Sequence, residues 1–156
     1  MNDTTSAAWG DELTDPVTYR GRIAASWGHC DSAQIIYYPN YFDWFDQCFQ
    51  ALLTAAGLDQ RALRERFGIV GTGAVNASGQ FFSPVTYGDV LETVSFVESW
   101  SERSFTIYHR FEVDGRLAVE GREVRLWLVR TGSSEAEIEA CPIPDAFRQL
   151  FDRPRS

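Results

Sequence analysis

The residues best suited to chemistry gather in one short stretch, between a strand-like segment and a strong helix pattern. Residues 28–32, GHCDS, have the composition of a turn, and the helix pattern begins after Pro39. A carboxylate at Asp31 would lie just before a helix N-terminus, whose free backbone amides can hold a developing oxyanion. Such an acid can act as a nucleophile or as a base toward water. The competing interpretation is that Asp31 only closes a turn.

Three other side chains have groups that could take part in a reaction. His29 could pair with Asp31 or polarise water, although a turn residue is the simpler interpretation. Cys30 could act as a nucleophile, but the only histidine near it is His29, and cysteines are common in protein cores. His109 falls on the apolar face of a strand pattern, which favours a satisfied histidine in the core or at an interface.

The composition excludes several classes of function. The chain has 156 residues, the size of one ordinary domain, and a formal net charge of -8, which argues against nucleic-acid binding. There is no lysine, so an anionic ligand would be held by arginine or by backbone amides. Three widely spaced cysteines indicate free thiols in a reducing compartment, and we expect a cytoplasmic protein. Two histidines and no C-x-x-C motif make a dedicated zinc site unexpected.

The elements that must position Asp31 follow from the hydrophobic periodicity. Residues 1–15 are polar and indicate a loose tail without a secretory signal, and residues 16–152 form one domain. Apolar residues at three- and four-residue steps predict a long helix over 41–56, with Asn40 and Asp43 as a capping pair. The other predicted elements are strands over 17–27, 69–82, 89–100, 104–113 and 116–130, a short helix over 59–67, an edge strand within 138–144 and a terminal helix over 145–151.

This order predicts an α+β domain in which an antiparallel sheet packs on the long helix. Residues 105, 107, 111 and 113 share one face of their strand, and Asp114-Gly115 is a strong hairpin signal. In the following strand the apolar residues change phase around Gly121, which suggests a β-bulge there.

The segment from Trp27 to Asp46 resembles the signature of the 4-hydroxybenzoyl-CoA thioesterase family, a G-x-x-D turn followed by an aromatic-Pro-Asn-Tyr helix start. The likeness continues at 68–71, 87–91 and 100–105 and covers roughly residues 20–147. The resemblance implies the hot-dog fold, a long central helix wrapped by a curved antiparallel β-sheet. It also implies hydrolysis of an acyl-CoA, with CoA as part of the substrate and no separate cofactor.

The resemblance also implies roles for individual residues. Asp31 takes the place of the catalytic carboxylate, and Tyr38 that of the residue whose backbone amide faces the thioester oxygen. Asp46 matches a second acid on the long helix, with a hydrogen-bonded structural acid as the alternative. His29 and Gln34 depart from the family pattern, in which an acid and a glycine are usual.

Arg103 and Ser104 occupy the strand-turn position where the family binds the CoA nucleotide, and the alternative for Arg103 is a solvated hairpin charge. We expect a homodimer or homotetramer with the pocket between subunits, because the aromatic residues exceed what one small core needs. The acyl group is expected to be aromatic, with a short- or medium-chain aliphatic acyl group as the alternative. A non-catalytic hot-dog protein that binds acyl-CoA is the alternative of a different class.

Overall fold

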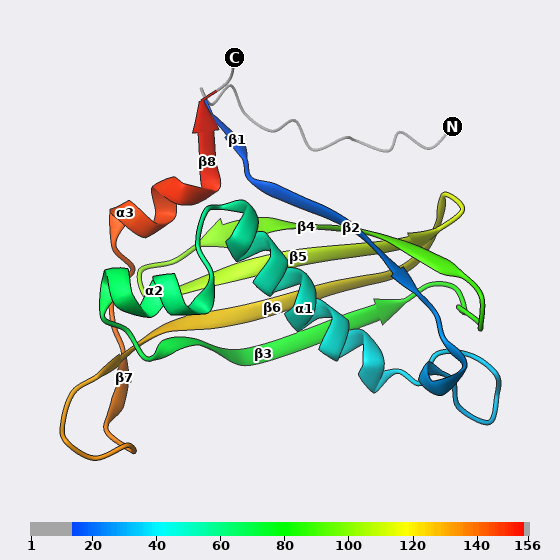
Figure 1. Ribbon diagram of the computed structural model, residues 1–156, viewed down its shortest axis with the longest axis horizontal. Coiled ribbons are helices and arrows are strands. Elements are labelled where there is room, and N and C mark those ends of the chain that lie inside the picture. Colours follow the sequence, from blue (N-terminus) through cyan, green and yellow to red (C-terminus); the bar gives the residue numbers. More distant parts are fainter. Residues whose placement is uncertain (1–13, 155–156) are drawn as a thin grey trace.

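The computed structural model describes residues 14–154, in which one long helix lies across a twisted antiparallel sheet (Figure 1). The sheet has six strands in the order β2-β4-β5-β6-β3, with β7 paired to β6. Two short terminal strands, β1 and β8, pair separately. The strands are β1 (Thr14–Pro16), β2 (Thr18–Ala24), β3 (Gly71–Phe81), β4 (Val90–Trp100), β5 (Ser104–Val113), β6 (Arg116–Arg130), β7 (Ile138–Ala140) and β8 (Asp152–Pro154). The helices are α1 (Pro39–Ala55), α2 (Gln60–Phe67) and α3 (Asp145–Arg148), with short 3₁₀ helices at Trp27–His29 and Gln149–Phe151.

The arrangement confirms the predicted α+β architecture and the order of its main elements. The expected tail, residues 1–15, lies outside the described residues except for Thr14 and Asp15, which begin β1. None of the helices among residues 14–154 is long and apolar enough to cross a membrane.

Helix α1 forms because its apolar residues repeat at helical spacing and are covered by the sheet. The side chains of Phe45, Phe49 and Leu52 are closed to solvent. The predicted capping pair is wrong, however. Tyr38 is the N-cap and no side chain caps the helix, while Asn40 Nδ2 instead donates to the carbonyl oxygen of His29 at 2.8 Å. Asn40 therefore ties the start of α1 to the preceding loop.

The inward face of β5 is the predicted one, but β6 presents its more polar face to the core. Phe105, Ile107, Phe111 and Val113 are buried, as expected. On β6 the buried residues include Glu123, Arg125 and Trp127, while Val124, Leu126 and Leu128 lie on the half-buried outer face. The reason is that the charged groups of β6 have partners beneath α1, which offset the cost of burying them.

Gly121 is not at a β-bulge. The register shift between β5 and β6 falls between Phe111 and Glu112, whereas Gly121 pairs regularly with His109. A Cβ on Gly121 would lie 2.2 Å from the ring of Phe45, so glycine lets the helix approach the sheet here. The predicted hairpin is confirmed, since Asp114 and Gly115 both have positive φ, 49° and 76°.

Candidate active site

The loop that carries Asp31 is a narrow, doubly anchored hairpin at one end of the sheet. The amide of Asp31 donates to Ile35 O at 3.0 Å, and the amide of Gln34 donates to Asp31 O at 2.9 Å. Cys30 pairs with Ile36 across the loop, and Ile35 pairs with Thr86 of a neighbouring loop. The segment is therefore held by backbone hydrogen bonds on both sides, although it contains no long strand.

Only one of the two carboxylate oxygens of Asp31 accepts a hydrogen bond from the described part of the chain. Its Oδ1 accepts a hydrogen bond from the amide of Ala33 at 2.8 Å, and its Oδ2 has no partner among residues 14–154. The side chain is exposed and opens onto a hollow of about 350 Å³. The other residues that line this hollow are Trp27, Cys30, Ser32, Gln34, Thr86 and Tyr87. One carboxylate oxygen is thus positioned by the turn while the other is available for chemistry.

Tyr38 stands at the N-terminus of the 17-residue helix α1, directly before Pro39. Its backbone amide donates to no acceptor within the described part of the chain. The amide of Tyr37 donates to His29 O at 2.9 Å, which keeps the helix start beside the Asp31 loop. An unused amide at a helix N-terminus favours negative charge on a nearby atom.

A second, mostly apolar hollow of about 330 Å³ lies on the Tyr38 side of this loop. Its walls include Tyr38, Tyr41, Phe81 and Phe82. Tyr38, Phe81 and Phe82 are each at least half exposed, unlike the aromatic residues beneath α1. Both hollows therefore adjoin the Asp31 loop, one polar with aromatic walls and the other apolar.

His29 turns away from Asp31. Its Nδ1 lies 2.9 Å from Ser26 Oγ and accepts a hydrogen bond from the amide of Ser26, and its ring meets the edge of Trp44 at 5.0 Å. Within residues 14–154, no ion pair or hydrogen bond joins His29 to Asp31. The side chain therefore closes the 3₁₀ turn in this structure. The neighbouring thiol of Cys30 faces Ser26 O at 3.7 Å.

Asp46 belongs to an ion-pair network under α1. Its Oδ1 accepts hydrogen bonds from Arg125 Nη2 at 2.7 Å and from Gln50 Nε2 at 3.4 Å. Arg125 also contacts Glu123 at 2.7 Å, and Glu123 in turn contacts His109 at 2.9 Å. The contacts of Asp46 agree with the alternative interpretation, a hydrogen-bonded acid, and its match to the second acid of the family stays a prediction. His109 is the satisfied core histidine that its position in the strand predicted.

Arg103 and Ser104 lie at the turn between β4 and β5. That turn is at the opposite end of the sheet from the loop that follows β2 (Figure 1). The Asp31 loop contacts the segment just before β4, where Ile35 pairs with Thr86, and Arg103 follows the end of that strand. The eleven residues of β4, rising ~3.3 Å each, separate the two ends by roughly 35 Å. Arg103 is exposed, and within residues 14–154 its guanidinium donates only to Ala140 O, at 3.4 Å. One chain does not bring these candidates together with Asp31.

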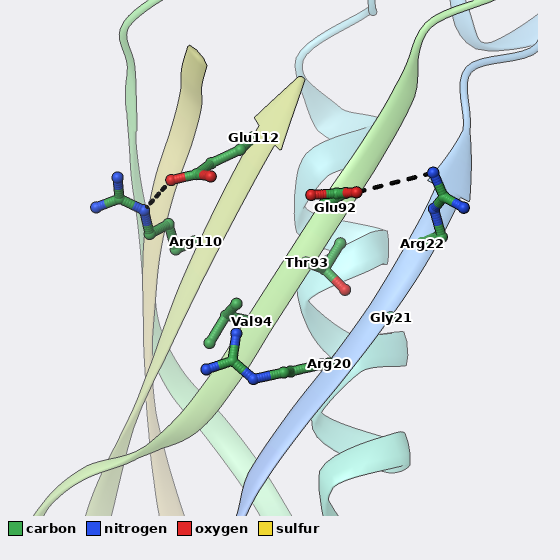
Figure 2. Close-up of a pocket in the computed structure, with 8 residues that line it drawn as sticks. All are labelled: Arg20, Gly21, Arg22, Glu92, Thr93, Val94, Arg110 and Glu112. Atoms are coloured by element: carbon green, nitrogen blue, oxygen red, sulfur yellow. Dashed lines mark hydrogen bonds and ion pairs between the residues drawn. The ribbon is translucent and has the colours of Figure 1, made fainter. Parts of the chain in front are cut away.

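A larger hollow, of about 520 Å³, lies elsewhere and has a different character (Figure 2). It is a groove over β2, β4 and β5, in which Arg22 pairs with Glu92 at 3.7 Å and Arg110 pairs with Glu112 at 2.5 Å. Most of its charges neutralise one another, and it holds no nucleophile near a free helix amide. By volume this groove would be the better candidate for the active site, but the smaller hollow at Asp31 has the reactive group.

Sequence reasoning did not place residues 83–89, the second loop of the site, beside Asp31, although the family likeness includes residues 87–91. Thr86 Oγ1 donates to Gln34 O at 2.8 Å, and Asp89 Oδ2 accepts from the amide of Thr86 at 3.0 Å. Tyr87 meets Trp27 edge to face, with ring centroids 5.8 Å apart. The T-Y-G-D run is a turn signal, but only the tertiary structure places it against Asp31.

Comparison with known proteins gives consistent results. A family model described as the thioesterase-like superfamily matches residues 25–151. The chain is 30% identical over 141 residues to the 4-hydroxybenzoyl-CoA thioesterase of Pseudomonas sp. (strain CBS-3), covering 86% of this chain and 96% of that protein.

Solved structures agree. The three-dimensional structure of the 4-hydroxybenzoyl-CoA thioesterase from Pseudomonas sp. strain CBS-3 matches with a TM-score of 0.76 and 26% identity, covering 85% of this chain and 98% of that chain. An Asp-to-Asn mutant of a 4-hydroxybenzoyl-CoA thioesterase, complexed with 4-hydroxybenzoyl-CoA, matches with a TM-score of 0.78 and 26% identity over 86% and 99% of the two chains. A gentisyl-coenzyme A thioesterase matches with a TM-score of 0.70 and 29% identity over 85% and 98%. These matches confirm the hot-dog fold.

Proposed function

The chain belongs to the thioesterase-like superfamily and is a thioester hydrolase, and on that premise we propose that it hydrolyses an acyl-CoA to a free acid and CoA. The observation that carries the proposal is the free Oδ2 of Asp31, on a hairpin tied to the N-terminus of α1. A carboxylate with an open oxygen supplies the nucleophile or base, and the unused amide of Tyr38 supplies the oxyanion site.

In the general-base form of the mechanism, Asp31 removes a proton from water as the oxygen adds to the thioester carbon. The carbonyl oxygen becomes an oxyanion that the Tyr38 amide stabilises. The C–S bond then breaks, and CoA leaves as a thiolate that takes the proton from Asp31. In the nucleophilic form, Asp31 attacks the carbon itself to give an acyl-aspartate anhydride, and water then hydrolyses that anhydride. Both forms end with the same acid and thiol, and both need Asp31 ionised.

We propose an aromatic acyl group as the preferred substrate class. The relatives act on 4-hydroxybenzoyl-CoA and gentisyl-CoA, both of which are aromatic thioesters. The walls of the two hollows support the same class, because Trp27 and Tyr87 flank one and Tyr41 and Phe81 flank the other. Aromatic walls favour a flat ring through offset and edge-to-face contacts.

We further propose that the working enzyme is at least a dimer. Strand β3 is 11 residues long and pairs only with β6 among residues 14–154, which leaves one edge open. Exposed apolar residues follow that edge, including Val75, which is 59% exposed. A long open edge is a template on which a strand of another chain can pair. Antiparallel pairing of two β3 edges would place the partner's β4–β5 end, which carries its own Arg103, at the same end of the joint sheet as the Asp31 loop.

The experiment that tests the function is a panel of purified acyl-CoAs incubated with the protein and a thiol reagent. Benzoyl-CoA, 4-hydroxybenzoyl-CoA, butyryl-CoA and octanoyl-CoA separate aromatic from aliphatic preference. If CoA is released fastest from the aromatic substrates, both acyl-CoA hydrolysis and the aromatic preference are supported. Faster release from the aliphatic substrates would contradict the aromatic preference. Binding without release would instead identify a non-catalytic acyl-CoA-binding protein. Light scattering at micromolar concentration tests the dimer, and a monomer would contradict it.

A further inference from the structure

Gln34 has a backbone conformation that favours glycine. Its φ is 64°, and within residues 14–154 the only other non-glycine residue with positive φ is Asp114, in the β5–β6 hairpin. Aspartate tolerates this left-handed region because its short side chain can hydrogen-bond locally, whereas glutamine gains no such help. A glycine at position 34 would therefore relieve the backbone, and the glutamine side chain carries a cost.

The loop, and not the glutamine side chain, imposes this conformation. The amide of Gln34 donates to Asp31 O at 2.9 Å, and its carbonyl oxygen accepts from Thr86 Oγ1 at 2.8 Å. The next residue, Ile35, pairs with Thr86. These contacts involve only the backbone of residue 34, so any residue at this position would be held in the same way.

Gln34 lines the same hollow as Asp31. Its carboxamide makes no hydrogen bond with any residue between 14 and 154, so the fold does not use it. Ser32 and Thr86 are polar neighbours in that hollow, and Trp27 and Tyr87 are its aromatic walls. A backbone outlier that persists beside a candidate catalytic residue, with a polar group that the fold does not use, motivates a functional hypothesis for that group.

We propose that Gln34 is a substrate-recognition residue whose carboxamide hydrogen-bonds a neutral polar group of the bound thioester. The inference rests on the proposed function and adds a specificity determinant to the same hollow. A carboxamide both donates and accepts, so it complements a hydroxyl on the acyl group or an amide of the pantetheine arm. A carboxylate on the ligand is disfavoured because Asp31 would repel it in the same hollow.

The test compares Gln34→Gly with Asp114→Gly, which makes the same change at the other left-handed position, far along the chain from the loop. Both variants should fold, because glycine suits both backbones. Gln34→Gly should raise Tm by about 2–4 °C and lower kcat/KM about tenfold, the loss expected for one neutral hydrogen bond. Asp114→Gly should leave kcat/KM unchanged. Gln34→Asn, which keeps a carboxamide and tolerates positive φ, should retain part of the recognition.

Three substrates distinguish the sources of the recognised group. These are 4-hydroxybenzoyl-CoA, benzoyl-CoA and the S-ethyl thioester of 4-hydroxybenzoic acid, which lacks the pantetheine arm. A loss confined to the two hydroxylated substrates identifies the acyl hydroxyl. A loss confined to the two CoA substrates identifies a pantetheine amide. Kinetic constants for Gln34→Gly within about twofold of wild type on all three, against the tenfold expected, overturn the proposal.

Failure of the proposed function is recognised separately. It would appear as wild-type protein that hydrolyses none of the three thioesters. Isothermal titration with 4-hydroxybenzoyl-CoA and benzoyl-CoA then decides the role of Gln34 without turnover. Weaker binding to Gln34→Gly than to wild type supports recognition, while equal binding, or none to either protein, overturns it.

Discussion

Arg125 Nη2 donates to Asp46 Oδ1 over 2.7 Å and so joins the middle of α1 to β6. The same guanidinium contacts Glu123 at 2.7 Å and lies 4.1 Å from the centre of the Phe49 ring. The two carboxylates differ sharply in environment, because the side chain of Asp46 is 51% exposed and that of Glu123 only 4%. Arg125 is therefore chiefly the counter-ion of a buried acid.

This difference predicts unequal losses of stability. Arg125→Met leaves Glu123 buried without its cation and should cost about 3–5 kcal/mol of unfolding free energy. Asp46→Asn removes a half-exposed partner and should cost less than about 1 kcal/mol. Urea denaturation of the two variants checks the order. Equal losses would mean that the Arg125–Asp46 pair contributes as much to stability as the buried Arg125–Glu123 pair.

Asp31→Asn should abolish turnover while preserving the fold. Asparagine can still accept the amide of Ala33 through its side-chain oxygen but has no basic oxygen to face the hollow. The kcat should fall at least ~10²-fold, the smallest effect typical of a lost general base. Calorimetry of acyl-CoA binding should show affinity near that of wild type. A folded variant that keeps a third of wild-type turnover would end the proposed mechanism.

Cys30 and Cys48 should react with an alkylating reagent at different rates. Cys30 is partly exposed and lines the hollow of Asp31, whereas burial raises the pKa of the Cys48 thiol, which is 3% exposed. Iodoacetamide should modify Cys30 well before Cys48 and inhibit the enzyme by filling the hollow. Peptide mass spectrometry measures the extent of alkylation at each cysteine over time.

Cys30→Ala provides the matching control. It should stay active and become resistant to the reagent, since the proposed mechanism uses Asp31 and no thiol. Loss of turnover in folded Cys30→Ala would instead favour a nucleophilic role for the thiol.

Tyr41 should make the protein sensitive to alkali. Burial raises the pKa of Tyr41 to about 12, so the folded state keeps a proton that the unfolded chain loses near pH 10. Because the folded state then binds more protons, stability is unaffected below pH 10 and falls as pH rises from about 10 to 12. The fall should reach about 2–3 kcal/mol for a shift of two units.

Tyr41→Phe removes the titrating phenol and tests this assignment. The hydroxyl of Tyr41 has no hydrogen-bond partner among residues 14–154, so its loss should cost little at neutral pH. Between pH 9 and pH 11, the unfolding free energy measured by denaturation should fall less for Tyr41→Phe than for wild type. An unchanged difference would assign the alkaline effect to other groups.

Arg103→Ala tests the proposed contact with the CoA nucleotide. The exposed guanidinium would bind a phosphate equally in the ground and transition states, so KM should rise while kcat changes little. The effect should vanish with a pantetheine thioester that lacks the nucleotide. Arg130→Ala, another exposed arginine, is the control and should leave KM unchanged. Unchanged KM in Arg103→Ala would remove this residue from the site.

Much of this protein is determined by local sequence. The apolar spacing of α1, the alternation of β5 and the Asp114-Gly115 turn each specify an element within a few residues, because helix and strand periods are local properties. The position of Asp31 before a helix start is local in the same way. The sequence therefore predicted the α+β architecture and the residue at the centre of the candidate site.

Only the tertiary structure decided which groups meet. Arg125 faces inward, where it meets buried Glu123 and also Asp46, 79 residues away on α1. Hydrophobic alternation alone would have placed Val124 and Leu126 inside. The left-handed backbone of Gln34 likewise depends on Thr86, which is 52 residues away. Contacts between distant segments set the energy of burying a charge or straining a backbone, and no local period records them.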